Sequence, residues 1–262
     1  MKTSIWIAIL CASLSIAVVS SFALERPPIE KAVEMTNMYQ EGMPSFAPLD
    51  QMFKVEKFAD YDDGGFYMNV VSIHEHLGTH MDAPAHKIRG GKFLPDVPLD
   101  SYWMVPATVF DVSEKCAQNA DYKVTVDDIT AWESAHGKIP DGAWLVINTG
   151  WYKKTSDLDA FWNKDEKETW HFPGVGAEAA NFLVNERNIK GVALDVTSID
   201  NGADISTGTS DVHDIILGAE ILIVENVTNL DKLPATGALL SISPLLVDKA
   251  SGGPVRVIGI LP

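Results

Sequence analysis

The chain has 262 residues, of which 46% are hydrophobic and 21% are charged, a composition typical of a globular protein. It carries 36 acidic residues against 20 Lys and Arg, which gives a formal net charge of −16 at pH 7. No Lys/Arg cluster interrupts this acidic character, so we expect no nucleic acid and no anionic membrane as a partner.

The first 23 residues differ from the rest of the chain. Lys2 is followed by an apolar run over 5–19 and then by a small-x-small pattern that ends at Ala23. This order is typical of a secretory signal peptide, and the run is too short to favour a transmembrane anchor. We therefore expect cleavage after Ala23, a protein that is secreted or enters the secretory-pathway lumen, and a single domain over 24–262.

After this leader, short apolar runs alternate with helical patterns. The part before about residue 75 is less regular, whereas the later runs lack strict alternation and predict strands covered on both faces. Strands are predicted over 68–73, 106–112, 143–148, 191–196 and 220–224, and helices over 129–136 and 176–186. Thr125 and the acids after it predict a helix start. Alternating strands and helices indicate an α/β domain.

Metal-binding side chains concentrate in one segment. Three histidines and one aspartate lie within eleven residues, at His76, His80, Asp82 and His86. Imidazole nitrogens and carboxylate oxygens suit Zn²⁺, Mn²⁺ or Fe²⁺. Gly78 and Pro84 favour a loop, because glycine frees the backbone and proline removes a donor. The segment therefore predicts an open catalytic metal site.

Taken alone, each of these residues would be an ordinary surface histidine or a turn-forming aspartate. Their grouping favours a site, in which His76, His80 and Asp82 form the pattern H-x₃-H-x-D. His86 lies four residues further on, where a histidine near a metal-bound water can act as general acid or base. The strand over 68–73 is expected to present His76 on one face. No H-E-x-x-H pattern is present here, which disfavours a zinc protease.

A second group lies far downstream. His213 is followed twelve residues later by Glu225, which ends an apolar run. A buried glutamate needs a partner, and either a structural ion pair or a metal would supply one. We also expect Cys116 to be buried or unpaired, and the glycosylation sequon at Asn226 to be unused because it lies in an apolar run.

The segment over 76–86 matches the signature H-x-G-T-H-x-D-x-P-x-H of the cyclase family, which includes bacterial-type kynurenine formamidases and isatin hydrolases. The resemblance continues through most of the chain. It covers the stretch 88–112, the block 148–151, which is similar to the family's R-T-G-W, and the region 172–200. It also covers His213 and Glu225. One departure is Asn148, which stands where arginine is frequent in the family.

The resemblance implies a swivelling β/β/α fold, the kynurenine formamidase (cyclase)-like fold, with a mixed sheet and flanking helices. It implies His76, His80 and Asp82 as ligands of one divalent metal, Zn²⁺ or Mn²⁺. In binuclear members Asp82 would bridge to a second metal held by His213 and Glu225. It further implies a homo-oligomer, a dimer or a tetramer.

The activity implied is hydrolysis of a small aromatic amide, with His86 as the catalytic acid/base. We expect kynurenine formamidase activity first, which converts N-formyl-kynurenine and water to kynurenine and formate. Opening of a cyclic amide, as in isatin hydrolases, is the alternative; a secreted non-catalytic binding protein is an alternative of another class. The signal peptide and Asn148 both favour a substrate other than formylkynurenine. Aromatic residues are candidates for the substrate walls: Phe46, Phe66, Tyr67, Trp103 and Trp151.

Overall fold

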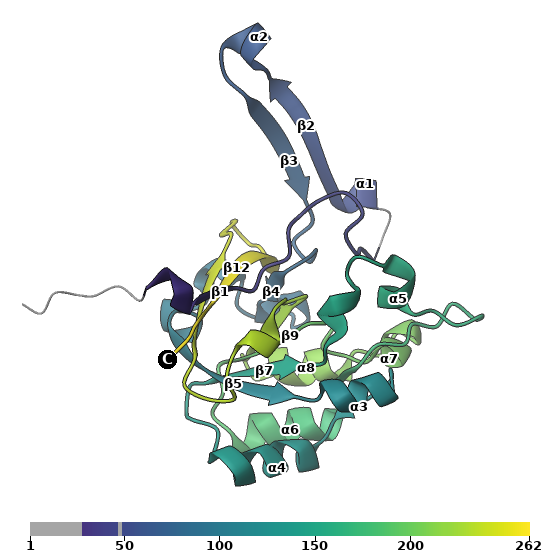
Figure 1. The fold of residues 1–262 in the computed structure, drawn as a ribbon, viewed down its shortest axis with the longest axis vertical. Coiled ribbons are helices and arrows are strands. Elements are labelled where there is room, and N and C mark those ends of the chain that lie inside the picture. Colours follow the sequence, from purple (N-terminus) through teal and green to yellow (C-terminus); the bar gives the residue numbers. More distant parts are fainter. Residues whose placement is uncertain (1–27, 47–48) are drawn as a thin grey trace, which may run out of the picture.

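The structure is a computed structural model that describes residues 28–46 and 49–262 (Figure 1). The predicted signal peptide lies outside these residues and stays a prediction. No helix within the described ranges has the length and apolar character needed to cross a membrane.

The main sheet has eight strands in the order β1-β12-β11-β5-β7-β9-β10-β4. Its middle strands β5, β7, β9 and β10 are parallel to one another, whereas β4, β11 and β12 pair antiparallel. The sheet closes on itself, because β12 pairs with β4 through 252–254 and with β11 through 255–260. The strands span β1 Ala32–Glu34, β4 His80–Asp82, β5 Val105–Asp111, β7 Trp144–Asn148, β9 Gly191–Leu194, β10 Leu222–Glu225, β11 Leu239–Pro244 and β12 Gly252–Ile260.

Helices cover the outer face of the parallel strands. The helices span α3 Ser113–Gln118, α4 Val126–His136, α5 Leu158–Trp162, α6 Ala177–Glu186, α7 Gly202–Ser206 and α8 Asp211–Gly218. In β7, Leu145 and Ile147 pack towards the helices, and Trp144 and Val146 pack into the core inside the closed sheet. This alternation explains why the run is apolar throughout: both faces of the strand are buried. The short pair β6 Lys123–Val124 and β8 Gly174–Val175 completes the body.

The strands and helices predicted from the apolar runs are present, with ends shifted by a few residues. Helix α4 begins after Thr125, whose side chain accepts a hydrogen bond from the amide of Asp128 in a reciprocal capping box. Gly191 is required in β9, because a Cβ there would collide with the Trp144 ring. Cys116 is buried and free, as expected. Asn226 is buried and donates its side-chain amide to the Gly78 carbonyl, consistent with an unused sequon.

Two local predictions were wrong. The metal-site segment is not a loop throughout: His80–Asp82 forms the buried strand β4, because it pairs with both β10 and β12. Strand β3 (Met68–Ile73) exists but ends before His76, which lies in the following turn. β3 does not belong to the eight-stranded sheet. Within the described residues its only strand partner is β2 (Phe53–Ala59).

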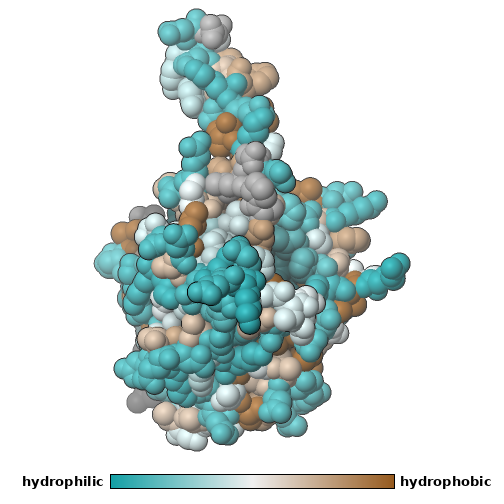
Figure 2. Space-filling model, turned by 90° about the vertical axis from the view of Figure 1, so that its right-hand side faces the viewer, coloured by the Kyte–Doolittle hydropathy of each residue, from teal (hydrophilic) through white to brown (hydrophobic). Residues whose placement is uncertain are grey.

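Strands β2 and β3, with the short helix α2 (Tyr61–Gly64) at their tip, form a hairpin that projects from the body; α1 (Leu49–Met52) lies at its base (Figure 1). Neither face of the hairpin is buried, and its surface mixes apolar and polar side chains (Figure 2). A two-stranded hairpin exposed on both faces is marginally stable alone.

Candidate metal centre

Strand pairing brings the two parts of the site together. His80 and Asp82 lie on β4, and Glu225 ends β10, where it is directly opposite His80 in the antiparallel register. His213 lies on α8, which packs against β10 and against the short turn Pro84–His86. Residues more than a hundred positions apart in the chain therefore face one point.

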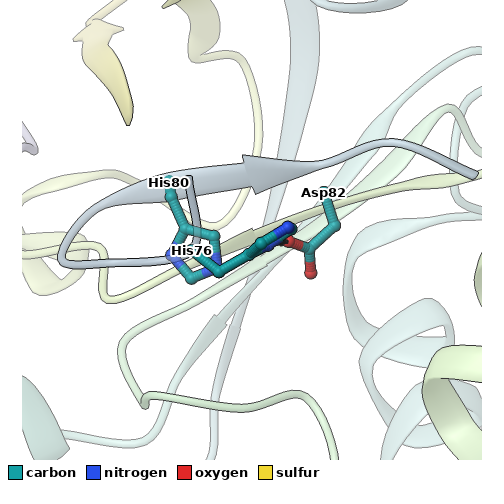
Figure 3. Close-up of side chains that lie close together, drawn as sticks. All are labelled: His76, His80 and Asp82. Atoms are coloured by element: carbon teal, nitrogen blue, oxygen red, sulfur yellow. Dashed lines mark hydrogen bonds and ion pairs between the residues drawn. The ribbon is translucent and has the colours of Figure 1, made fainter. Parts of the chain in front are cut away.

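Asp82 contacts three histidines of this cluster, two of which, His76 and His80, are drawn with it in Figure 3. Its Oδ1 is 2.7 Å from His76 Nδ1 and 3.3 Å from His80 Nε2. Its Oδ2 is 3.6 Å from His213 Nε2. Glu225 completes the cluster: its Oε2 is 3.5 Å from His80 Nε2, and its Oε1 is 3.3 Å from His213 Nε2. Five of the predicted residues thus converge within contact distance.

Two histidines are held from outside the cluster. His80 Nδ1 lies 2.9 Å from the carbonyl of Gly78, which accepts its hydrogen. His213 Nδ1 lies 2.5 Å from Asp200 Oδ2, and the Asp200 carboxylate also accepts hydrogen bonds from the backbone amides of Val212 and His213. With Nδ1 as the donor, the neutral form of each ring presents the lone pair of Nε2 to the centre. An imidazole fixed by a partner on its far nitrogen is the usual arrangement of a metal ligand.

The cluster fits a divalent cation. Asp82 Oδ2 is buried and has no hydrogen-bond partner among the described residues, although a buried carboxylate oxygen normally has one. His76, His80 and Asp82 each offer an atom within 4.8 Å of the others, and so do Asp82, His86 and His213. The first group agrees with the predicted ligand set. The second contains His86, which the sequence assigned to proton transfer.

Without a metal, the histidines of the cluster take up protons that balance the negative charges of its carboxylates. Burial alone would lower the pKa of His80, but Asp82 and Glu225 outweigh it and raise that pKa to about 9. Burial opposes the charged form of His213 too, yet Asp200, Asp82 and Glu225 hold its pKa well above the usual value. Against the cost of burial, the surrounding histidines hold the pKa of Asp82 well below its usual range. The position therefore favours positive charge, as a proton or as a metal.

His86 is electrostatically different. Burial lowers its pKa to about 4; Asp82 opposes this shift, and the neighbouring histidines add to it. Its ring centre lies 3.8 Å from that of His76 and 5.8 Å from that of His213. The His86 imidazole is therefore neutral near pH 7 and keeps an unprotonated nitrogen beside the cluster, as a general base must.

A cavity of about 200 Å³ opens onto the cluster and is called the site cavity below. Of the five predicted substrate-wall residues, Phe46 lines it and contacts Trp162 and Trp170. The other walls come from residues of the cluster and of the segments around it: His76, His80, Asp82, His86, Lys87, Thr197, Ser198, Ile205, Ser210, His213 and Glu225.

The other four aromatic residues lie elsewhere in the chain. Phe66 and Tyr67 are at the outer end of the hairpin. Trp103 lines a separate cavity beside β11. Trp151 is buried and donates its indole hydrogen to the Phe161 carbonyl, so it packs the core.

One functional candidate, Asp200, was not predicted from the sequence. Asp200 anchors His213 and belongs to the block 172–200, but it received no role there. In the same block, Asp195 is buried and accepts hydrogen bonds from both the amide and the hydroxyl of Thr149, so it fixes the loop after β7 rather than the site. The signal for Asp200 was weak, since an aspartate in a loop is commonly a turn former.

Comparison with known proteins defines the class of this chain as hydrolases that act on carbon–nitrogen bonds other than peptide bonds. The chain belongs to the cyclase family: the Cyclase family model ("Putative cyclase") matches residues 25–201, well over half of its length. That match contains His76, His80, Asp82 and His86, and it ends before His213 and Glu225.

Three individual likenesses support this assignment. Isatin hydrolase from Roseibium aggregatum is 34% identical over 225 residues, which is 84% of this chain and 85% of that protein. Kynurenine formamidase from Bacillus cereus is 26% identical over 212 residues, 80% of this chain and 88% of that protein. The solved structure of isatin hydrolase A from Ralstonia solanacearum has a TM-score of 0.80 at 32% identity and covers 88% of this chain and 92% of its own. The predicted fold class is confirmed.

Proposed function

We propose that the chain is a metal-dependent amidohydrolase that opens the cyclic amide of an isatin-type substrate. The observation that carries this proposal is the likeness to isatin hydrolase, 34% identical against 26% for kynurenine formamidase over similar lengths. This likeness places isatin before formylkynurenine as the substrate, whereas the sequence alone placed formylkynurenine first.

The size of the site cavity supports the same order. Its volume of about 200 Å³ is below the roughly 300–1,000 Å³ usual for sites that take drug-sized ligands. A compact fused ring fits such a space. Phe46 supplies an aromatic wall, and Lys87, which donates to Ser210 Oγ at 2.6 Å, supplies polar groups near the opening.

In this proposal His76, His80 and Asp82 hold one Mn²⁺ or Zn²⁺, and His213 and Glu225 with Asp82 hold a second where two are bound. When bound, a divalent cation makes water a stronger nucleophile near neutral pH and polarises a carbonyl oxygen. The anionic carboxylates of Asp82 and Glu225 compensate the positive charge inside a buried site.

Proton transfer falls to His86. Its neutral ring takes a proton from the attacking water as the new carbon–oxygen bond forms. It returns that proton to the departing nitrogen as the carbon–nitrogen bond breaks. The products are a carboxylate and an aryl amine on one opened molecule.

A substrate comparison tests the proposal. The purified chain from residue 24, loaded with Mn²⁺ or Zn²⁺, is expected to open isatin with a kcat/KM at least about tenfold above that for N-formyl-kynurenine, a difference of about 1.4 kcal/mol in transition-state binding. The loss of absorbance of each substrate measures the rates. A preference for formylkynurenine would overturn the substrate assignment and leave the hydrolase class intact. Tight metal-dependent binding of both without turnover of either would support the non-catalytic alternative.

We also propose that the chain forms a homo-oligomer through the hairpin of β2 and β3, with a second copy of this chain as the partner. Apolar side chains on it are exposed by about half or more, among them Val55, Phe58 and Val71. Exposed apolar area of this kind is typical of an interface. The hairpin has too little packing of its own to stay ordered, and a second copy covers it.

Val55 and Val71 lie directly across from one another in the hairpin. The double variant Val55→Glu/Val71→Glu is therefore expected to shift the protein from oligomer to monomer, because it puts two carboxylates into one covered face. Light scattering after size-exclusion chromatography measures the mass. Leu99→Glu, at a residue that is 61% exposed outside the hairpin, is the matched control and keeps the oligomer. A wild-type chain that is monomeric at micromolar concentration would contradict the proposal.

A further inference from the structure

One ligand of the proposed metal, His76, is held by residues that lie outside the family signature. Its Nε2 lies 3.0 Å from the hydroxyl oxygen of Ser251, 175 positions downstream. The Ser251 hydroxyl donates to Glu75 Oε2 at 2.7 Å, and the Ser251 amide donates to the same oxygen at 3.0 Å. Asp82, imidazole, hydroxyl and Glu75 carboxylate thus form one continuous chain.

The hydrogen-bond directions in this chain determine which nitrogen of His76 carries the hydrogen. A hydroxyl has one hydrogen, and Ser251 gives it to the Glu75 carboxylate, which only accepts. The remaining lone pair of Ser251 must accept from His76, so the hydrogen of the neutral ring is on Nε2. Nδ1 is then a bare lone pair, 2.7 Å from an oxygen of Asp82. Two acceptors then face each other there, and either a proton on Nδ1 or a metal ion bound by both atoms compensates them.

The backbone around Ser251 also restricts the position of the His76 imidazole. The Ser251 carbonyl accepts a hydrogen bond from the amide of Ala83, and Gly252 is opposite Asp82 in the pairing of β12 with β4. A Cβ on Gly252 would lie 2.5 Å from His76 Cε1 and 2.6 Å from the Met81 carbonyl oxygen. Only glycine leaves room for the imidazole at this position, so the start of β12 packs directly against the His76 ring.

We propose that Ser251 and Glu75 are positioning residues of the metal centre, which orient His76 so that it coordinates through Nδ1. This inference rests on the proposed function. It makes His76 unlike His80 and His213, whose anchored nitrogen is Nδ1 and whose ligand atom is Nε2. It also makes the start of the C-terminal strand part of the metal centre, although the matched family model ends at residue 201.

Zinc affinity of the full mature chain tests the inference. Competition with a chromogenic chelator gives the Zn²⁺ dissociation constant of wild type, Ser251→Ala, Ser251→Thr and Glu75→Gln. Loss of a hydrogen-bond partner of a ligating histidine typically costs roughly 10- to 100-fold in metal affinity, and we expect that loss for Ser251→Ala. Ser251→Thr keeps the hydroxyl and is expected to bind close to wild type. Ser243→Ala, at an exposed serine of the adjacent β11, is the control.

A second measurement separates orientation from general damage. Long-range ¹H–¹⁵N correlation spectra of the zinc-loaded wild type are expected to show His76 protonated on Nε2 and zinc-bound on Nδ1. The double variant Ser251→Ala/Glu75→Gln is expected to bind no more weakly than Ser251→Ala, because the two residues act in series. Thermal unfolding of each metal-free variant checks that it is folded.

The outcomes distinguish the positioning role from the metal centre itself. Wild-type affinity in Ser251→Ala, or zinc on Nε2 of His76, would overturn the positioning role and leave the metal centre standing. Failure of the wild type to bind zinc or manganese would overturn the metal centre and this inference with it. Weak binding in Ser251→Ala that Ser251→Thr does not restore would also contradict the role given to the hydroxyl.

Discussion

Replacement of Asp82 by asparagine is expected to remove both bound metal and hydrolysis. Asp82 is the one side chain that lies within 3.6 Å of ring nitrogens of His76, His80 and His213 among the described residues. The amide keeps the shape but loses the negative charge, and its NH₂ group turns a donor towards the cation. A metal supplies several kcal/mol of transition-state stabilisation, so kcat/KM should fall by at least about 10³-fold.

Metal analysis of the purified variant and the rate of isatin opening measure the two effects together. Asp127→Asn is the matched control, because Asp127 is an exposed carboxylate in the first turn of α4, away from the cluster. It should keep both metal and rate. A variant Asp82→Asn that retains its metal at wild-type stoichiometry would show that the metal binds elsewhere.

Replacement of His86 by alanine is expected to separate metal binding from chemistry. General acid–base catalysis contributes typically about 10²- to 10⁴-fold, and kcat should fall within this range. Metal content should not change, because the five proposed ligands all remain. His86 lies against His76 at the cavity, with the two rings tilted and their centres 3.8 Å apart, and burial lowers its pKa to about 4, so its ring is neutral near pH 7.

The measurement for His86→Ala combines metal stoichiometry with kcat, and His136→Ala, at an exposed histidine ending α4, is the control. Two results would contradict the assignment. Normal turnover would remove the acid/base role. Loss of one metal equivalent would instead make His86 a ligand in the group that it forms with Asp82 and His213.

Most of the site could be predicted from the sequence because its signal is local. His76, His80, Asp82 and His86 lie within eleven residues, and so dense a group of imidazole and carboxylate side chains favours a metal site over four unrelated surface residues. The apolar runs that became β7, β9 and β10 were recognisable for a similar reason, since strands buried on both faces need no alternation.

The features that could not be predicted depend on pairing between distant segments. β4 is three residues long and is a strand only because β10 and β12 lie on either side of it. β12 begins with two glycines and a proline, residues that ordinarily argue against a strand, yet Gly252 is what lets the chain pass beside His76. The Ser251 contact has no local signal at all.

The substrate walls were the least predictable part. Phe46 lines the site cavity because the N-terminal segment crosses the body to reach it, and nothing in its neighbourhood along the chain indicates this. Trp151 lies within a family-like block and still packs the core through its bond to Phe161. Aromatic residues serve cores and sites alike, so their type alone does not assign them.

The most direct measurement of metal-dependent hydrolysis is the rate of isatin opening before and after metal removal. We expect that the wild-type chain, stripped of metal by a chelator and dialysed, loses at least about 10³-fold in rate and remains folded. Return of Mn²⁺ or Zn²⁺ should restore the rate as one or two equivalents bind, and should restore nothing in Asp82→Asn. A stripped wild-type chain that opens isatin as fast as the loaded one would contradict the metal-dependent mechanism.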